Sequence, residues 1–315
     1  MSLISICIPT YKRAQLLVEA VESCLQQDYR PIEILVGDDS PQPAGRQDVE
    51  MLCAAASVPL EYLHHSPGLG QAGNVNSLLN AAKGHRLLLL HDDDRLLPGA
   101  LSTLSDCFKR HPEIVAAYGR QRLIQDDGTD LGDRAAESLN QSFRKSLTHA
   151  GLQTDSVEAA LQRQFPNNAY LVATDKAKAI GFREKTEVGD ACDTDFGVRL
   201  AIANPGPRFY LTATYTAEYR ITRMAISRTS KSTADYYRFL LRLEVPEASE
   251  QTKQTVLTHI AANAAGQLAR QGARQEAMSV YLSRWYGWRR RLSPRGLSHL
   301  ARILLPIHDS MNPRH

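Results

Sequence analysis

Long apolar runs and closely spaced cysteines are both missing from this sequence. No apolar run approaches the ~18 residues that a transmembrane helix needs, so a membrane-spanning segment of that kind is excluded. The five cysteines are scattered, and no pair has the CxxC spacing of a zinc or redox motif. We therefore expect reduced thiols in a cytoplasmic protein rather than a disulfide framework. The first residues also lack a basic segment followed by an apolar one, so no signal peptide is expected.

The composition is that of an ordinary globular protein with one unusual segment. The chain has 315 residues, of which 43% are hydrophobic and 23% are charged, enough for a large core. The formal net charge is +3, but residues 270–315 contain nine arginines against two acidic residues. Trp285 and Trp288 lie in the same segment, and basic residues with aromatics favour an anionic partner.

Residues 284–315 therefore suit peripheral contact with the inner face of the cell membrane. The alternative is that both tryptophans pack on the rest of the protein or across a homodimer. A nucleic-acid partner is not expected, because the residues before this segment carry net negative charge.

Strand and helix signals alternate from the start of the chain to residue 125. Expected strands are 3–10, 32–38, 60–65, 86–91 and 114–118, and the helices between them are 14–27, 46–56, 71–82 and 99–110. Such alternation predicts an α/β fold with a mostly parallel, doubly wound sheet flanked by helices.

After residue 119 the pattern becomes mixed. Expected elements are a turn at 125–128, helices at 134–150, 156–165 and 190–203, a strand at 169–173, a strand pair at 209–222, and helices at 247–270 and 275–288. We expect a domain over residues 1–228, divided into halves 1–125 and 126–228, and a helical extension over 229–315.

The run His91-Asp92-Asp93-Asp94 follows four leucines, which indicate a strand buried on both faces. Ligands of open α/β sheets bind where the strands end. Adjacent carboxylates repel one another unless a cation lies among them, and Mg²⁺ or Mn²⁺ with a phosphate suits such oxygen ligands. The alternative is a solvated acidic turn that caps a helix beginning near Pro98.

Two earlier strands also end in polar residues. In Pro9-Thr10-Tyr11-Lys12-Arg13, the threonine can hydrogen-bond, the tyrosine can stack on a base and Arg13 can bind a phosphate. In Gly37-Asp38-Asp39-Ser40, a carboxylate can accept the imide N–H of uracil or thymine, or bind the guanine edge. The alternative for each is a helix cap, by Thr10 or by Asp39. The glycine-rich loop 68–74 lacks Walker A or Rossmann spacing and is typical of a helix start.

A third acidic group, Asp190, Asp193 and Asp195, precedes Arg199 in an expected helix. Asp195 and Arg199 are spaced to pair, which contributes ~0.5 kcal/mol if the pair is exposed. Acids in a first helical turn also favour the helix dipole. The functional alternative makes Asp193 a general base.

In their order along the chain, these motifs resemble those of family 2 glycosyltransferases with the GT-A fold, over roughly residues 3–228. They lie at 9–13, 37–40, 68–74, 87–98 and 192–195. The resemblance implies transfer of a sugar from a nucleotide-diphospho-sugar, inversion at the anomeric centre, and a divalent metal, Mn²⁺ or Mg²⁺.

The resemblance also implies roles for individual residues. The nucleotide-binding set that it implies is Pro9, Thr10, Tyr11, Arg13, Asp39 and Asn74. Within that set Asp39 would bind the base. Asp93 is the implied metal ligand, the last acid of a DxD-like motif, and Asp193 is the implied catalytic base.

The sequence departs from the family pattern at three positions. His91 stands where the first acid of the DxD motif is more common, which leaves Asp92 to contact the ribose or the metal. Cys192 replaces the glutamate that usually precedes the catalytic base. Many members have a histidine that helps hold the metal and diphosphate where Thr222 stands here.

Because of that last difference, Arg220 or Arg223 is expected to supply positive charge to the diphosphate. The expected enzyme uses a UDP- or dTDP-sugar and a saccharide or lipid-linked saccharide acceptor, in bacterial surface polysaccharide or glycoconjugate synthesis. The departures leave open a catalytically inactive sugar-nucleotide-binding or scaffold protein of the same fold. Nucleotidyl transfer is a third hypothesis, but the first strand lacks the glycine-rich basic loop that it needs.

Overall fold

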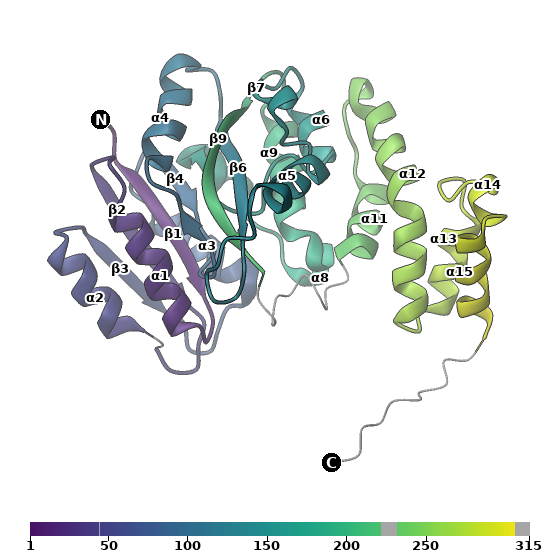
Figure 1. Ribbon diagram of the computed structural model, residues 1–315, viewed down its shortest axis with the longest axis horizontal. Coiled ribbons are helices and arrows are strands. Elements are labelled where there is room, and N and C mark those ends of the chain that lie inside the picture. The colour runs from purple at the N-terminus through teal and green to yellow at the C-terminus, as the bar shows by residue number, and fades with distance from the viewer. Residues whose placement is uncertain (44, 222–231, 306–315) are drawn as a thin grey trace, which may run out of the picture. The chain divides into compact units, whose positions relative to one another are not determined.

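The computed structural model describes residues 1–43, 45–221 and 232–305, and the chain divides into two compact units. One unit contains Met1–Glu187 and Cys192–Arg228, and the other contains Val188–Ala191 and Thr229–His315. The larger unit is built on a nine-stranded sheet of order β3-β2-β1-β4-β8-β6-β9-β5, with β7 paired to β9 (Figure 1). Among the described residues, no helix combines the length and the apolarity needed to cross a membrane.

The first half of the sheet is parallel, as expected. Its strands are β1 (Ile4–Thr10), β2 (Ile32–Asp38), β3 (Leu60–His64) and β4 (Arg86–Leu89). β1 pairs with β2 on one side and with β4 on the other, both in parallel register. All four strands therefore end at the same edge of the sheet.

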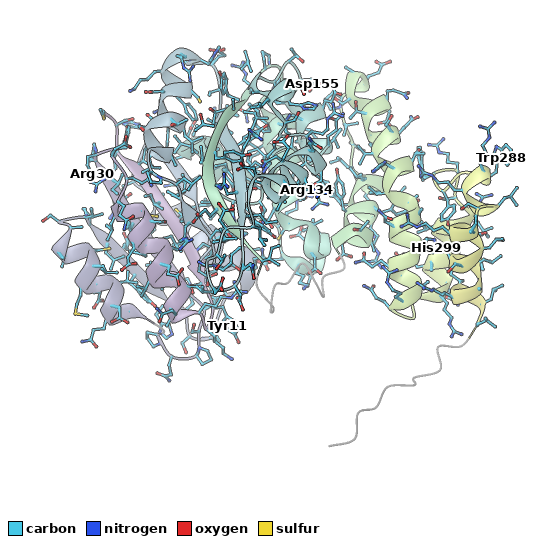
Figure 2. All side chains as sticks on the ribbon, in the orientation of Figure 1. Tyr11, Arg30, Arg134, Asp155, Trp288 and His299 are labelled. Carbon is cyan, nitrogen blue, oxygen red and sulfur yellow. The ribbon has the colours of Figure 1, made fainter. Side chains whose placement is uncertain are left out.

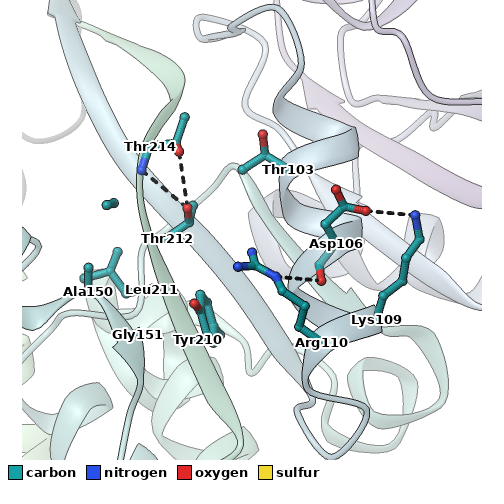
Figure 3. A pocket seen from close by; sticks show the side chains of 11 residues that line it. Thr103, Asp106, Lys109, Arg110, Ala150, Gly151, Tyr210, Leu211, Thr212 and Thr214 are labelled. Atoms are coloured by element: carbon teal, nitrogen blue, oxygen red, sulfur yellow. Dashed lines mark hydrogen bonds and ion pairs between the residues drawn. The ribbon is translucent and has the colours of Figure 1, made fainter.

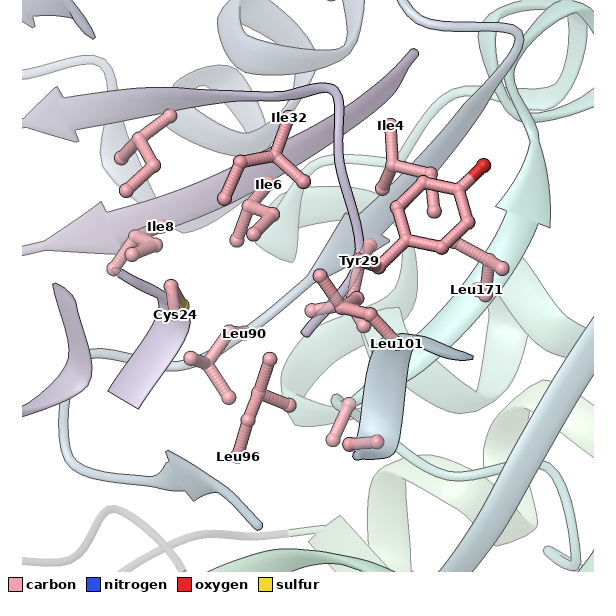
Figure 4. Packing of buried hydrophobic residues seen from close by; sticks show 14 of the residues in the cluster. Ile4, Ile6, Ile8, Cys24, Tyr29, Ile32, Leu90, Leu96, Leu101 and Leu171 are labelled. Carbon is pink, nitrogen blue, oxygen red and sulfur yellow. The ribbon is translucent and has the colours of Figure 1, made fainter. Parts of the chain in front are cut away.

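Helices cover both faces of these strands, which confirms the doubly wound arrangement. They are α1 (Ala14–Leu25), α2 (Arg46–Ala55), α3 (Gly70–Ala81) and α4 (Ala100–Arg110). Ile6 and Ile8 of β1 pack in one buried cluster with residues of α1 and α4, such as Cys24 and Leu101 (Figure 4). Cys7 points to the other face, where its thiol lies 3.8 Å from a carbonyl of α3. Each fully buried aliphatic side chain stabilises this core by about 1.5–3 kcal/mol.

The second half of the sheet is mixed. β8 (Tyr170–Ala173) is antiparallel to both β4 and β6 (Ala116–Ile124), and β6 is parallel to β9 (Phe209–Arg220). Two short strands, β5 (Arg95–Leu96) and β7 (Gly151–Leu152), pair antiparallel with β9.

The expected strand pair over 209–222 is wrong, because β9 is one continuous strand. No glycine, proline or asparagine, the residues that favour hairpin turns, interrupts it. Its register with β6 instead shifts beyond Tyr118 and again at Arg120. A Cβ atom at Gly119 would lie 2.4 Å from Thr216 Oγ1, so this close approach of the two strands requires glycine.

The helices that follow β6 differ from the expected ones: those expected over 134–150 and 156–165 end early, and the helices over 174–180 and 185–188 were not expected. They are α5 (Asp133–Ser142), α6 (Ser156–Leu161), α7 (Thr174–Ile180), α8 (Lys185–Val188) and α9 (Cys192–Ala203). Arg144 and Arg163 adopt positive φ angles of 53° and 59° just beyond α5 and α6. That left-handed conformation cannot continue a right-handed helix, which explains the early ends.

The smaller unit is helical. Its elements are η2 (Gly189–Ala191), α11 (Ser232–Arg242), α12 (Glu247–Arg270), α13 (Arg274–Leu282), α14 (Trp288–Arg291) and α15 (Pro294–Leu304). The expected helix over 275–288 ends at Leu282, because Ser283 is extended. Trp285 is half-buried with the Arg284 guanidinium 4.0 Å from its ring centre, whereas Trp288 is 64% exposed (Figure 2).

All five cysteines are free and buried. Burial raises the pKa of Cys24 to about 12 and that of Cys53 to about 11. The thiols therefore behave as small apolar side chains of the core, in accord with the scattered spacing in the sequence.

Candidate active site

Three parallel strands bring the expected site residues together at one edge of the sheet. β1 ends at Thr10, β2 ends at Asp38, and the acidic run 91–94 follows β4. The Asp39 amide donates to the Thr10 carbonyl at 3.1 Å, and Thr10 Oγ1 donates to Asp92 Oδ2 at 2.7 Å. Residues from three distant segments thus meet through direct hydrogen bonds.

Helix capping does not explain these residues, so the alternative interpretations fail. The N-cap positions are Arg13 for α1, Gly45 for α2 and Gly99 for α4, and none of the three makes a side-chain capping bond within the described chain. Thr10, Asp39 and the acidic run all lie before these positions. Their polar side chains therefore need another explanation.

Arg13 is the positive partner of the acidic run. Its Nη1 atom donates to Asp92 Oδ1 at 3.0 Å and to Asp93 Oδ2 at 2.7 Å. Burial raises the pKa of Asp92, and the positive charge of Arg13 opposes that rise. The Arg13 side chain remains 26% exposed, so an anionic ligand can reach it.

His91, Asp93 and Asp94 offer ligand atoms that all lie within 4.8 Å of one another. An imidazole with two carboxylates suits a transition-metal cation such as Mn²⁺ better than Mg²⁺, which prefers oxygen ligands. Asp92 lies outside this group, because its carboxylate faces the end of β1. The group therefore contains Asp93, which was expected to bind the metal. It also contains His91 and Asp94, which were expected only as neighbours of that ligand.

Asp94 is fully buried and held from two sides. Its Oδ1 atom accepts the Arg220 amide at 2.7 Å, and its Oδ2 atom accepts the Asn168 Nδ2 group. Burial, with repulsion from Asp93, raises the pKa of Asp94 to about 7, while His91 opposes the rise. An added cation would favour the ionised form of this carboxyl group.

Asp193 lies in the first turn of α9 and is half-buried. Burial raises its pKa, and the charges of His91 and Arg163 oppose that rise. His91 thus interacts electrostatically with both Asp193 and Asp94. The expected base and one candidate metal ligand are therefore both near enough to His91 to interact with its charge.

Asp195 and Arg199 form a buried ion pair rather than an exposed one. Asp195 is 0% exposed, and Arg199 Nη2 lies 2.6 Å from its Oδ2 atom. Arg199 also donates to the Ile180 and Gly181 carbonyls at 2.7 Å, which fixes α9 to the end of α7. Removing one partner of such a pair costs about 3–5 kcal/mol, so its role is structural.

The loop after β1 is folded so that its aromatic residue faces outward. Pro9 pairs with Gly37 in the sheet, and Lys12 has a φ angle of 58° while its amide donates to Ser40 Oγ at 2.8 Å. Tyr11 is 54% exposed at this turn (Figure 2). The ring is therefore accessible to a planar ligand.

Asp39 follows the end of β2, and Asn74 of α3 packs against the last residues of that strand. The Asp39 carboxylate is 3.0 Å from His65 Nδ1. Asn74 is buried, and its Nδ2 group donates to the Gly37 carbonyl at 2.8 Å, while its Oδ1 atom has no partner among the described residues. A Cβ atom at Gly37 would lie 2.0 Å from that oxygen, so the packing of α3 on β2 requires glycine here.

Arg220 is committed to contacts within the protein. Its guanidinium donates to Glu19 Oε2 at 2.6 Å and to two backbone carbonyls, including that of Asp93 at 2.8 Å. The Arg220 side chain is also only 1% exposed, so a diphosphate cannot reach it without a local rearrangement, and that role stays a prediction. Thr222 and Arg223 lie outside the described residues.

Asn168 and Glu19 contact site residues that no local pattern connects to them. Asn168 reaches Asp94 because β8, which begins two residues later, is antiparallel to β4. A strand at 169–173 is predictable from its apolar residues, but its neighbour in the sheet is not. No signal in the sequence alone would have identified either contact.

A cleft of about 730 Å³ lies at the opposite end of the sheet, away from this site (Figure 3). It is lined by residues of α4, β7 and the first half of β9, including Asp106, Arg110 and Tyr210. β9 runs from this cleft to Arg220 beside the acidic run. The cleft is therefore not part of the candidate active site.

The sequence matches the model of one known family. Residues 5–171 match Glycosyl transferase family 2. A relative is the GalNAc(5)-diNAcBac-PP-undecaprenol beta-1,3-glucosyltransferase of Campylobacter jejuni, 36% identical over 153 residues, which are 49% of this chain and 44% of that enzyme. The chain spans less than half the length of the first curated relatives that it matches.

Solved structures share the fold at low sequence identity. TarS 1–349 of S. aureus in complex with UDP has a TM-score of 0.64 at 16% identity, with 95% of this chain and 87% of that 1–349 chain covered. The mannosyltransferase PcManGT of Pyrobaculum calidifontis, in complex with GDP-Man and Mn²⁺, has a TM-score of 0.60 at 17% identity, with 96% and 86% covered. These similarities confirm the GT-A type of α/β fold.

Proposed function

Because the chain belongs to glycosyl transferase family 2, we propose that it moves a sugar from a nucleotide-diphospho-sugar to an acceptor hydroxyl, with inversion at the anomeric carbon. The observation that carries this function is the group of ligand atoms from His91, Asp93 and Asp94, with His91 also interacting electrostatically with Asp193. Such a transfer needs positive charge at the leaving diphosphate and a base at the acceptor hydroxyl. Both requirements have candidate residues at this one place.

We propose that His91, Asp93 and Asp94 hold a divalent cation, with Mn²⁺ favoured over Mg²⁺. When bound, such a cation stabilises the charge that develops on the leaving nucleoside diphosphate. The spacing of the three ligand atoms supports this assignment, and the PcManGT complex contains Mn²⁺. A cation on the carboxylates would release Arg13 from Asp93, and Arg13 would then bind a donor phosphate.

The nucleoside is proposed to bind over the ends of β1 and β2. Tyr11 offers an exposed ring for stacking, and Asp39 offers a carboxylate to the base imide N–H. Pro9, Thr10 and Asn74 are the other proposed nucleotide-binding residues of this region. A UDP- or dTDP-sugar is the proposed donor, which the UDP complex of TarS supports.

Asp193 is the proposed general base. Its carboxylate accepts the proton of the acceptor hydroxyl while the hydroxyl oxygen attacks the anomeric carbon, opposite the leaving diphosphate. The pKa that burial raises suits this role, because a base with a higher pKa accepts a proton more readily. Arg220 and Arg223 remain proposed sources of positive charge for the diphosphate.

Measurement of donor turnover tests the proposal. Purified protein is assayed for hydrolysis of UDP-, dTDP- and GDP-sugars with and without Mn²⁺. Asp193→Asn should lower turnover by ~10²–10⁴-fold and leave UDP binding intact, since general base catalysis contributes about that much. Asp93→Ala should instead abolish the Mn²⁺-dependent part of UDP binding. Binding of UDP without any turnover would favour the inactive sugar-nucleotide-binding protein.

A lipid-linked acceptor at a membrane surface is the proposed setting. The relative from C. jejuni is named for a PP-undecaprenol substrate. In the helical unit, Trp288, Leu292 and Leu297 are 64%, 70% and 54% exposed among arginines of α14 and α15. Apolar side chains with arginines are the composition that binds anionic lipid surfaces.

Co-sedimentation with anionic vesicles tests that setting. The double variant Trp288→Ala, Leu292→Ala should bind more weakly than the wild type. Leu241→Ala, which removes an exposed leucine of α11, is the matched control and should bind normally. Equal binding by all three proteins would exclude this surface as the membrane contact.

A further inference from the structure

Lys145 is a buried lysine that the proposed reaction does not use. It is 2% exposed and lies in the loop after α5. No carboxylate pairs with it in the part of the chain that the structure describes, and burial lowers the pKa of Lys145 to about 7. Lysine is rarely buried without such a partner, so its position needs a reason.

Lys145 begins a line of hydrogen bonds that ends at the candidate metal site. Its Nζ atom donates to Gln121 Oε1 at 2.9 Å, and Gln121 Nε2 donates to Asn168 Oδ1 at 3.2 Å. Asn168 Nδ2 then donates to Asp94 Oδ2. Gln121 and Asn168 are 5% and 0% exposed, so water does not compete for these bonds.

The backbone around Gln121 is fixed independently of its side chain. Asn140 Oδ1 accepts the Gln121 amide at 3.0 Å, and Asn140 Nδ2 donates to the Gln121 carbonyl at 2.8 Å. The Lys145 amide in turn donates to the Asn140 carbonyl at 2.7 Å. Within this line of hydrogen bonds, only the side-chain amides of Gln121 and Asn168 are therefore able to rotate by 180° and exchange their oxygen and nitrogen.

Each side-chain amide has one donating and one accepting end, so the line has a direction. Lys145 Nζ is the donor in its contact with Gln121, so the oxygen of Gln121 must face it. The ionised Asp94 carboxylate can only accept, so it requires the nitrogen of Asn168 to face it. Both ends of the line specify the same orientation of the two amides.

We propose that Lys145 is a positioning residue for the carboxylate of Asp94: by donating to Gln121 it keeps the donating end of Asn168 turned toward that metal ligand. This inference rests on the proposed binding of a divalent cation by Asp94. Hydrogen bonds to a ligating carboxylate orient it, and their loss typically lowers metal affinity by ~10–100-fold. Lys145 thus acts on the metal through two amides without touching it.

Two substitutions test whether the orientation of the Gln121 and Asn168 amides matters, and not only whether the hydrogen bonds exist. Lys145→Met removes the donor that fixes Gln121. Gln121→Glu keeps and strengthens the contact with Lys145, but the introduced carboxylate has no donor for Asn168 Oδ1. If Asn168 keeps its orientation, its Oδ1 atom faces the carboxylate oxygen of the introduced glutamate. If it rotates, its Oδ1 atom faces Asp94, and Asp94 loses the Asn168 donor. Val49→Ala, which truncates a buried side chain of α2 near the β3 edge, is the control for lost stability alone.

Free Mn²⁺ is titrated by electron paramagnetic resonance against the full-length proteins, with UDP present, and thermal unfolding is recorded in parallel. We expect both Lys145→Met and Gln121→Glu to lower Mn²⁺ affinity by ~10–100-fold. Gln121→Glu should do so without the loss of unfolding temperature that Val49→Ala causes, and Val49→Ala should bind Mn²⁺ normally.

Two outcomes would contradict the inference. One refutes only the role of Lys145, and the other also refutes the metal assignment. If the wild type binds Mn²⁺ and Gln121→Glu binds it equally well, Lys145 and Gln121 do not position Asp94, and the proposed function stands. If the wild type binds no Mn²⁺ with UDP, the metal assignment of the proposed function fails together with the inference.

Discussion

The buried Asp94 carboxyl group makes the free energy of unfolding of the metal-free protein depend on pH. Substitution of Asp94 by asparagine should remove this contribution. The pKa of Asp94 rises from 3.8 to about 7 in the folded state. An acid whose pKa is raised on folding destabilises the folded state when it ionises. The cost is absent below pH 3.8, grows as the pH rises, and reaches about 4 kcal/mol above pH 7.

Asp94→Asn removes this cost but loses one hydrogen bond. The introduced amide can still accept the Arg220 N–H, and its nitrogen then faces the nitrogen of Asn168. That mismatch costs about 1–3 kcal/mol at every pH. The ionisation cost is about 2 kcal/mol at pH 5, so the variant should lie within about 1 kcal/mol of the wild type there. At pH 8 the cost is about 4 kcal/mol, so the variant should be more stable by roughly 1–3 kcal/mol.

Urea unfolding in EDTA at pH 5 and pH 8 measures the effect. The stability difference between wild type and Asp94→Asn should change by roughly 2–3 kcal/mol between the two pH values. Asp106→Asn removes an exposed acid of α4 and should follow the wild type at both. Parallel pH dependences for wild type and Asp94→Asn would refute the reasoning, because Asp94 would then titrate normally.

Further predictions concern the metal preference, the catalytic base and the buried ion pair. His91→Asp should raise Mg²⁺ affinity relative to Mn²⁺, measured by calorimetry with UDP, because it replaces the nitrogen ligand with oxygen; an unchanged ratio would show that His91 does not ligate the metal. The kcat of the wild type should rise with pH through a pKa above 3.8, since burial raises the pKa of Asp193 and only the ionised form accepts a proton, and Asp193→Asn should remove that limb of the pH–rate profile. Arg199→Met should lower the free energy of unfolding by about 3–5 kcal/mol in chemical denaturation, because it leaves the buried Asp195 carboxylate with only the more distant Arg183, 3.6 Å away, whereas a loss under 1 kcal/mol would mean that the pair is dispensable.

The parallel half of the fold could be predicted from the sequence because its signals are local. Each strand of that half is a short apolar run, and each ends in polar residues such as Thr10, Asp39 and the acidic run. Parallel strands end at one edge, so this placement follows from the strand assignment alone. The structure agrees, with direct bonds between these segments.

The mixed half could not be predicted in the same way, because its contacts join segments that no local pattern relates. The strand at 170–173 is evident from its composition, but its place between β4 and β6 is not, and that place is what brings Asn168 to Asp94. The alternation and the Tyr and Thr content of residues 209–222 predict extended chain, but they do not distinguish one long strand from a strand pair. The structure has the single strand β9, whose register with β6 shifts between Leu211 and Tyr215. Lys145 shows the same limit, since a lone lysine in a loop carries no sign that it is buried.

The burial of every cysteine has a practical consequence for following this protein in solution. With all five thiols inside the core, and the pKa values of Cys24 and Cys53 raised, thiol reagents should modify the native protein only when it opens. The rate of labelling therefore reports local and global opening without any engineered probe. An added surface cysteine would react while the five buried thiols do not. Fluorophores or spin labels can therefore be placed at single chosen positions without first removing the native thiols.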